Sequence, residues 1–338
     1  MSLFAGDDDR RFDITGIENA LLDLLAHVDD SLLERLDLVK GTMRLVEIAE
    51  QRAILDSLGG LEPEIEPGGS CANVLRAASL LGVRTCYSSA VGRDTFGEAF
   101  ALGLEEHGVT DRCAILDGDT GTSVILVSAD GERTMNTHLG VCRRYSKANV
   151  PEEEVRSSRL FFTTAYIWDT PNQIEAIEHA LALARSHDVR LAVDLADPFA
   201  VERSRDVLHR HLAEGFDVVF ANAEEARMMT GLAPAAAAKK IAERTTITVV
   251  TDGVNGAYIS SAGEDVHVPA HRVEVVDTTG AGDCFAAGFL TGLVQGLPLR
   301  TCAELATLLA ADTITHFGVK LSADIPARVR DLVSACRT

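Results

Sequence analysis

The sequence predicts an α/β fold with a mainly parallel central sheet. From residue 191 onward, short apolar runs alternate with helical stretches, which is typical of a parallel sheet with helices on both faces. The apolar runs are Leu191–Leu195, Asp217–Phe220, Thr246–Val250 and Val273–Val276, and the helical stretches include Asn172–Ser186, Glu202–Ala213 and Thr301–His316. A chain of 338 residues with 46% hydrophobic content can bury the core of one such domain.

The first half of the chain predicts a small additional β-sheet. Thr122–Ser128 and Arg133–Thr137 flank Ala129–Glu132, whose Asp-Gly pair is typical of a hairpin turn. Asp13–Ile17 and Gly41–Leu45 also have strand composition. We therefore expect one domain over residues 1–338, with a small lid built from parts of residues 13–50 and 110–145. This sheet could close over a ligand, or it could extend the main sheet without moving.

Composition excludes several classes of protein. The 31 Lys and Arg residues against 51 Asp and Glu residues give a net charge of -20, which disfavours nucleic acid. The seven cysteines contain no C-x-x-C pair, so neither a disulfide framework nor a zinc site is indicated. No apolar run is long enough to span a membrane, and the N-terminus is acidic. We expect a cytoplasmic protein, either a monomer or a homodimer.

The most informative segment is Asp277–Ala286, which reads DTTGAGDCFA. Gly280-Ala281-Gly282 lies between the β-rich run Arg272–Val276 and the helix-like run Cys284–Leu290, so the sequence predicts a strand-to-helix turn. The first N–H groups of a helix lack intrahelical partners and attract anions. Because glycine has no side chain, a phosphate could approach this turn closely.

Asp283 lies at the start of the same predicted helix. Taken alone, it would be interpreted as a first-turn acid that stabilises the helix. Beside an anion-binding turn, its carboxylate could instead accept the proton of a hydroxyl that attacks a phosphoryl group. Gly280-Ala281-Gly282 begins like a dinucleotide motif, but Phe285 replaces the third glycine, and no P-loop string occurs anywhere.

A second motif accompanies this segment and supports a family resemblance. Gly68–Asn73, followed by Val91–Asp94, resembles the N-terminal signature of the PfkB family of ribokinase-like kinases, and Asp277–Phe289 resembles its C-terminal signature. The resemblance covers nearly the whole chain. Asn19–Asp23 and Gly131–Gly140 resemble the adenosine kinase-like branch. The resemblance to the PfkB family implies a ribokinase-like, three-layer α/β/α core.

The resemblance also implies the residues that bind the substrate. Asp23 resembles the carboxylate that accepts hydrogen bonds from two sugar hydroxyls. Gly68 and Gly69 would bring backbone N–H groups to the sugar, and Asn73 would add an amide. The alternatives are a solvated acid at position 23 and an ordinary glycine turn before a helix.

The ATP side is implied in the same way. Asn222 and Glu225 resemble the family's Asn-x-x-Glu element, in which Glu225 would act on Mg²⁺ through water; the alternative is a capped acidic first turn of a helix. Thr251, Gly253 and Gly256 resemble the nucleotide-binding loop at the end of a parallel strand.

Five further side chains have possible roles. Arg133 could neutralise phosphoryl charge when the lid closes, or it could be solvated. The pair Asp277 and Thr279, with the backbone near Gly318, resembles a monovalent-cation loop that would hold K⁺. Tyr166 and Trp168 could stack on a base or pack in the core.

The leading hypothesis is an ATP- and Mg²⁺-dependent kinase that phosphorylates the 5′-hydroxyl of a nucleoside, most simply adenosine. Asp283 would accept the proton, and the N–H groups of Gly280, Ala281 and Gly282 would hold the developing charge. A ribose or fructose kinase would share every residue on the phosphate side. A non-catalytic nucleotide- or sugar-binding protein is the alternative from a different class.

Overall fold

The structure is a computed structural model that describes residues 3–4 and 9–337. Its main feature is a nine-stranded sheet whose strands pair in parallel register except at one edge, where the last two pairings are antiparallel. In spatial order the strands are β16 (Glu264–Val268), β15 (Ala257–Ser261), β14 (Ile247–Thr251), β13 (Val218–Asn222), β12 (Arg190–Asp194), β11 (Ser158–Thr164), β1 (Phe12–Ile17), β5 (Thr85–Ser88) and β7 (Thr110–Asp111). The predicted mainly parallel sheet is confirmed.

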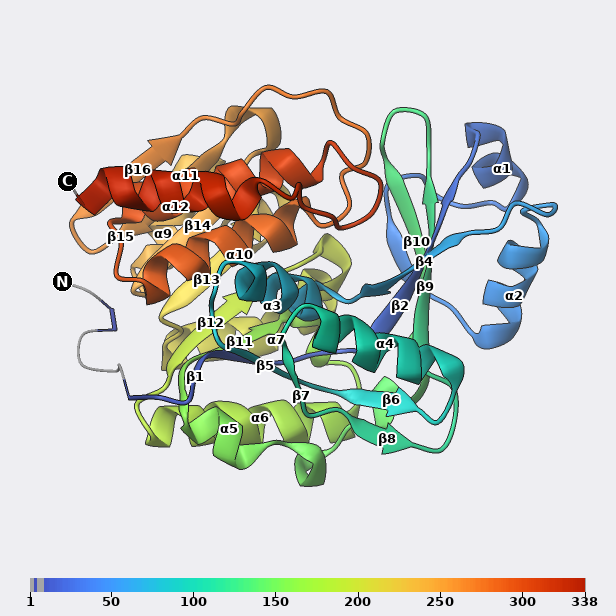
Figure 1. Cartoon of the computed structure of the whole chain (residues 1–338), viewed down its shortest axis with the longest axis horizontal. Helices are drawn as coiled ribbons and strands as arrows, with labels where there is room; N and C mark the ends of the chain where they lie inside the picture. Colours follow the sequence, from blue (N-terminus) through green and yellow to red (C-terminus); the bar gives the residue numbers. More distant parts are fainter. Residues whose placement is uncertain (1–2, 5–8, 338) are drawn as a thin grey trace.

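Helices cover both faces of this sheet, so the three-layer α/β/α architecture is also confirmed (Figure 1). One face packs against α3 (Ser70–Leu80), α10 (Ala281–Val294), α11 (Leu299–Thr313) and α12 (Ile325–Arg337). The other packs against α5 (Glu152–Arg156), α6 (Pro171–Ser186), α7 (Pro198–Glu214), α8 (Ala223–Thr230) and α9 (Pro234–Ala242). Alternate residues of β13 enter opposite hydrophobic clusters, Val218 one and Val219 the other, as the pleat of a strand requires.

A separate five-stranded sheet stands beside this core (Figure 1). Its strands in spatial order are β3 (Met43–Leu45), β10 (Arg133–His138), β9 (Gly121–Val127), β2 (Leu21–His27) and β4 (Glu64–Gly68). One face packs against α1 (Asp30–Arg35) and α2 (Ile48–Asp56) through Leu24, Val124 and Ile54. The predicted hairpin is confirmed, because β9 and β10 pair in antiparallel register.

The remaining elements connect the two sheets. β6 (Ala90–Gly92) and β8 (Ala114–Leu116) form a two-stranded sheet. α4 (Thr95–Glu106) packs against β6 of that sheet, β4 of the five-stranded sheet and β7 of the nine-stranded sheet. Among the helices of the described ranges, none combines the length and apolar character needed to cross a lipid bilayer.

Two sequence predictions about strands are wrong. Asp13–Ile17 falls within β1, which lies inside the large sheet between β11 and β5 rather than in the small sheet. Val273–Val276 forms no strand; its valines are about 40% exposed or more, and the segment is an irregular loop. The edge of the large sheet is instead closed by the hairpin β15–β16, so the glycine turn follows a loop and not a strand.

Candidate active site

The glycine turn at the start of α10 leaves backbone N–H groups free. Gly280 precedes α10 in a left-handed conformation, with φ of 73°, and no side chain caps the helix. The N–H groups of Gly280, Gly282 and Asp283 have no partner in the described chain, whereas Ala281 N–H donates to the Thr278 carbonyl over 3.3 Å. A Cβ atom at Gly282 would meet nothing within 4 Å. The turn therefore combines open space with unpaired donors, which suits an anion.

Asp283 is held by two side chains from the start of α3. Asn73 Nδ2 donates to Asp283 Oδ2 over 2.8 Å, and Ser70 Oγ donates to Asp283 Oδ1. All three residues line the same cavity. Burial raises the pKa of Asp283 above its ordinary value of 3.8, and the hydrogen bonds from Ser70 and Asn73 oppose that change. The carboxylate is therefore fixed in orientation and more basic than a solvated aspartate.

Asp23 faces this cavity from β2 of the small sheet. It is buried, and within the described residues its carboxylate accepts no hydrogen bond. A Cβ atom at Gly68 would lie 2.2 Å from the Asp23 carboxylate, and one at Gly69 would lie 2.7 Å from the Asn19 carbonyl oxygen. The two glycines are therefore required by close packing, and they leave the Asp23 carboxylate available to a ligand.

The electrostatic setting of Asp23 is unfavourable to its charge. Burial, followed by the neighbouring carboxylates of Asp283 and Glu66, raises the pKa of Asp23 to about 8, while Arg133 and Arg76 oppose the change. A buried carboxylate with no hydrogen bond is costly to the fold. Such a group is suited to hydroxyl donors of a ligand, which would stabilise its ionised form.

Glu18 is a further buried acid in the cavity wall, and the sequence did not single it out. Its carboxylate accepts the N–H of Asn19 over 2.9 Å and the N–H of Cys71, in the first turn of α3, over 3.0 Å. Burial raises the pKa of Glu18 to about 7, and the Asp283 carboxylate adds to this. Glu18 thus anchors the helix that presents Ser70 to Asp283. Its only sequence signal is an acid directly after a buried strand.

Arg133 and Tyr166 also line the cavity, whereas Trp168 does not. Arg133 begins β10, and its side chain forms no hydrogen bond or ion pair to the rest of the described chain, so it is free to reach a ligand. Trp168 is 3% exposed and packs in the core with His211, at a ring distance of 5.6 Å. Of the two aromatic residues, only Tyr166 is placed where it could contact a base.

Asn222 and Glu225 form a reciprocal cap at the start of α8. Asn222 Oδ1 accepts the N–H groups of Glu224 and Glu225, each over 2.9 Å. In return, Glu225 Oε2 accepts the Asn222 N–H over 2.8 Å, and Glu225 Oε1 accepts Asn222 Nδ2 over 2.5 Å. The capped acidic turn considered as an alternative from the sequence is therefore present. It does not conflict with a role of Glu225 through water.

Asp194, at the end of β12, is a second acid near Glu225 that sequence reasoning missed. Asp194 Oδ1 accepts the Ala196 N–H over 2.9 Å. Burial raises the pKa of Asp194 to about 7, with a further contribution from Asp283. Burial and the Asp194 carboxylate together raise the pKa of Glu225 well above its ordinary range. Two buried acids that repel each other would be stabilised by a cation between them.

The predicted nucleotide loop lies at the same edge of the sheet. Thr251 ends β14 and pairs in register with Asn222, which ends β13. The turn Gly253–Asn255 follows, and Gly256 has φ of 90°. A Cβ atom at Gly256 would lie 2.0 Å from the Val268 carbonyl oxygen, so only glycine fits there. These residues do not line the cavity around Asp283, but they adjoin Asn222 beyond the strand ends.

Asp277 organises the loop that precedes the anion-binding turn. Its Oδ1 accepts the Thr279 N–H over 2.9 Å and Thr279 Oγ1 over 2.7 Å, and its Oδ2 accepts the Gly318 N–H over 3.0 Å. The structure therefore brings Asp277, Thr279 and Gly318 together as the sequence predicted. A monovalent cation at this loop stays a prediction.

The fold and this cavity place the protein among the sugar and nucleoside kinases. Residues 43–326 match the pfkB family carbohydrate kinase model, so the chain belongs to that family. It is therefore an ATP-using phosphotransferase with an alcohol group as acceptor, and its substrate is a nucleoside or a sugar.

Several relatives are similar over most of their length. The crystal structure of adenosine kinase from Sinorhizobium meliloti is 34% identical, with a TM-score of 0.90, covering 95% of this chain and 99% of that one. A probable sugar kinase from Rhizobium etli is 32% identical, with a TM-score of 0.90, covering 95% and 98%. A cytidine kinase from Thermococcus kodakarensis is 30% identical over 261 residues, 75% of this chain and 89% of its own.

Proposed function

We propose that this protein transfers the γ-phosphoryl group of ATP to the 5′-hydroxyl of a nucleoside, with adenosine as the leading substrate. The observation that carries the proposal is the position of Asp283. Its carboxylate lies in one cavity with Asp23, on the first turn of a helix where the N–H groups of Gly280, Gly282 and Asp283 have no partner in the described chain. An alcohol held by Asp23 would therefore face both a base and an anion-binding turn.

In the proposed reaction, the Asp283 carboxylate accepts the proton of the attacking hydroxyl. The oxygen–phosphorus bond to the acceptor forms as the bond to ADP breaks, and the proton leaves late in a loose transition state. The unpaired N–H groups of Gly280, Gly282 and Asp283 hold the charge on the transferred group, and the Ala281 N–H would join them only by giving up its bond to the Thr278 carbonyl. Arg133, which has no partner elsewhere in the described chain, would approach the same group from the small sheet.

The small sheet would act as a lid. It supplies Asp23 and Arg133 to a cavity whose other wall is formed by residues of the core, including Ser70 and Asp283. Closure of this sheet would exclude water from the transferred phosphoryl group.

The charges in the cavity favour a neutral substrate. Three carboxylates, those of Glu18, Asp23 and Asp283, line it together with two arginines, Arg133 and Arg203. A phosphorylated or acidic sugar would meet more negative than positive charge, whereas the hydroxyls of a ribose would donate hydrogen bonds to the acids. This supports a nucleoside or a free sugar over a sugar phosphate.

Mg²⁺ fits the acidic pair Asp194 and Glu225. Each acid has a raised pKa and would be stabilised by a nearby cation. Within the described residues, no group of three or more His, Cys, Asp and Glu side chains could hold a metal. In the proposed complex Mg²⁺ would be held mainly by ATP phosphates and water. When bound, Mg²⁺ would neutralise charge on the ATP phosphates. Asp277 and Thr279 are proposed, in addition, for a monovalent cation such as K⁺.

A free-sugar kinase is the second candidate, because relatives of this chain include ribokinase from Haemophilus influenzae and a probable sugar kinase. A coupled assay of ADP release separates the two. The nucleoside proposal expects adenosine to exceed ribose and fructose by at least about 100-fold in kcat/KM, because a base adds binding energy at Tyr166. Higher activity on a free sugar would contradict it. ATP binding with no ADP from any acceptor would favour the non-catalytic alternative.

A further inference from the structure

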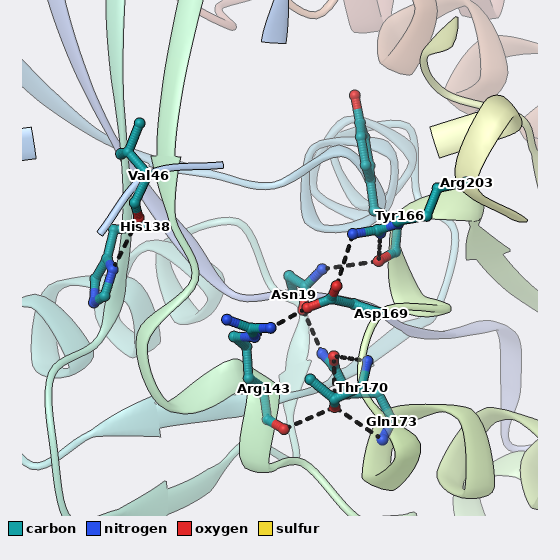
Figure 2. Close-up of polar contacts among 9 residues, drawn as sticks. All are labelled: Asn19, Val46, His138, Arg143, Tyr166, Asp169, Thr170, Gln173 and Arg203. Atoms are coloured by element: carbon teal, nitrogen blue, oxygen red, sulfur yellow. Dashed lines mark hydrogen bonds and ion pairs between the residues drawn. The ribbon is translucent and has the colours of Figure 1, made fainter. Parts of the chain in front are cut away.

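Two hydrogen-bond donors meet at one corner of the cavity. Asn19 and Arg203 both line the cavity, and both approach one acceptor, the carbonyl oxygen of Tyr166 (Figure 2). Asn19 Nδ2 lies 3.4 Å from this oxygen, and Arg203 Nη2 lies 3.5 Å from it. Both distances are long, so each nitrogen keeps donor capacity for a ligand.

The direction of the Asn19 amide is set by a chain of hydrogen bonds that begins at a backbone group. The N–H of Thr170 can only donate, and it donates to Gln173 Oε1 over 3.3 Å. Gln173 Nε2 must then point the other way, where it donates to Asn19 Oδ1 over 2.7 Å. Gln173 is fully buried, so water cannot replace either bond. Asn19 is therefore left with its NH₂ group, and not its oxygen, on the side of Tyr166.

Arg203 is fixed by separate contacts. Its Nη1 donates to Asp169 Oδ1 over 2.7 Å. Its guanidinium lies over the Phe199 ring, 5.3 Å from the ring centroid, which is close enough for a cation–π contact. Arg143 Nε lies 3.1 Å from the other oxygen of Asp169 (Figure 2). Asp169 thus offsets part of the charge of Arg203, which makes this corner a weaker site for a phosphate than a lone arginine would be.

We propose that Asn19 and Arg203 donate hydrogen bonds to an acceptor-bearing edge of the substrate's base, and that Gln173 and Asp169 are positioning residues that set this polarity. The inference rests on the proposed function, because it requires a nucleoside in the cavity. The ligand group at this corner is a ring nitrogen or a carbonyl oxygen of the base. An amino group there would compete with Asn19 and Arg203 for the Tyr166 carbonyl oxygen and would leave both donors without a ligand acceptor, so it is disfavoured.

Adenosine and its 1-deaza, 3-deaza and 7-deaza analogues test the proposal, because each analogue replaces one ring nitrogen with C–H. With the wild-type protein, one analogue is expected to lose about 10-fold or more in kcat/KM, the cost of an unpaired buried donor. In Arg203→Met and in Gln173→Glu, the loss of kcat/KM for that analogue is expected to shrink to about 3-fold or less. Arg203→Met removes the Arg203 donor, and Gln173→Glu turns the Asn19 amide so that its oxygen faces the ligand. Glu at position 173 cannot donate to Asn19 Oδ1, so the Asn19 amide should turn over.

Thr170→Ser is the matched control, since it keeps the backbone N–H that begins the chain of hydrogen bonds. It should preserve the wild-type pattern, with KM for adenosine unchanged. Two results would overturn the proposed roles of Asn19 and Arg203 and leave the nucleoside kinase proposal intact. One is a wild-type kcat/KM for all three analogues equal to that for adenosine, and the other is a loss that persists in both variants. Activity on a free sugar with none on any nucleoside would instead overturn the proposed function.

Discussion

Asp23→Asn should increase stability and decrease substrate binding in the same protein. Asp23 is buried against Gly68 with no hydrogen bond from the described chain, so its charge is a cost to the free protein. Asparagine has nearly the same shape and carries no charge. It can still accept a hydrogen bond from one hydroxyl. It lacks the second carboxylate oxygen with which the ionised Asp23 could accept a hydrogen bond from each hydroxyl of a ribose diol.

The size of the stability effect follows from the pKa of Asp23, which burial raises from 3.8 to about 8. Between these values the folded chain keeps a proton that the unfolded chain has released. The free energy of unfolding therefore falls as pH rises through this window, by up to about 1.4 kcal/mol per pH unit, and levels off above about pH 8. Asp23→Asn has no such proton to lose. Its free energy of unfolding should therefore exceed that of the wild type by a margin that grows by up to about 3 kcal/mol from about pH 5 to about pH 7.

Urea unfolding of both proteins at several pH values measures this difference. Asp29→Asn is a matched control, because Asp29 is exposed and caps no backbone group with its side chain. Its difference from the wild type should change little with pH. In the coupled assay, Asp23→Asn should lower kcat/KM by about 10- to 100-fold, mainly through KM. A stability difference that stays constant with pH would refute the electrostatic interpretation of Asp23.

Three further predictions test other parts of the site. Gly68→Ala should raise KM by about 10-fold or more, because its Cβ would lie 2.2 Å from the Asp23 carboxylate and displace it; an unchanged KM would contradict this. Arg133→Met should lower kcat by about 100-fold with an unchanged urea midpoint, since its side chain has no partner in the described chain. Asp194→Asn should raise the Mg²⁺ concentration for half-maximal activity by about 10-fold, measured by titration, if Asp194 and Glu225 act on the metal; an unchanged titration would remove Asp194 from the metal site.

Sequence patterns predicted the large sheet because its central strands are short, apolar and separated by helices. They failed where a segment with the composition of a strand has no neighbouring strand to pair with. Val273–Val276 has strand composition, yet it lies in an exposed loop, and pairing in a sheet depends on a neighbour that local sequence does not specify. Asp13–Ile17 shows the converse: it is a strand, but its own residues do not say which of two sheets it joins.

The two motifs predicted a site in which residues about 200 positions apart would meet, and Asn73 and Asp283 do meet. Glu18, Ser70 and Asp194 were missed as functional residues because their meaning lies in contacts between elements. Glu18, for example, is notable only because its carboxylate accepts the N–H of Cys71 on another element. A short motif identifies the residues that contact a ligand more readily than those that hold such residues in place.

The most direct test of the central claim is the turnover of Asp283→Asn. The carboxylate is held by Ser70 and Asn73 at a helix N-terminus where the described chain leaves the N–H groups of Gly282 and Asp283 unpaired. The variant should therefore keep ATP affinity and lose roughly 10²–10⁴ in kcat. Asp94→Asn is the control, because Asp94 accepts the Gly97 N–H at the start of α4 and is an acid at a helix start outside the cavity. Near-normal turnover in Asp283→Asn would contradict the account.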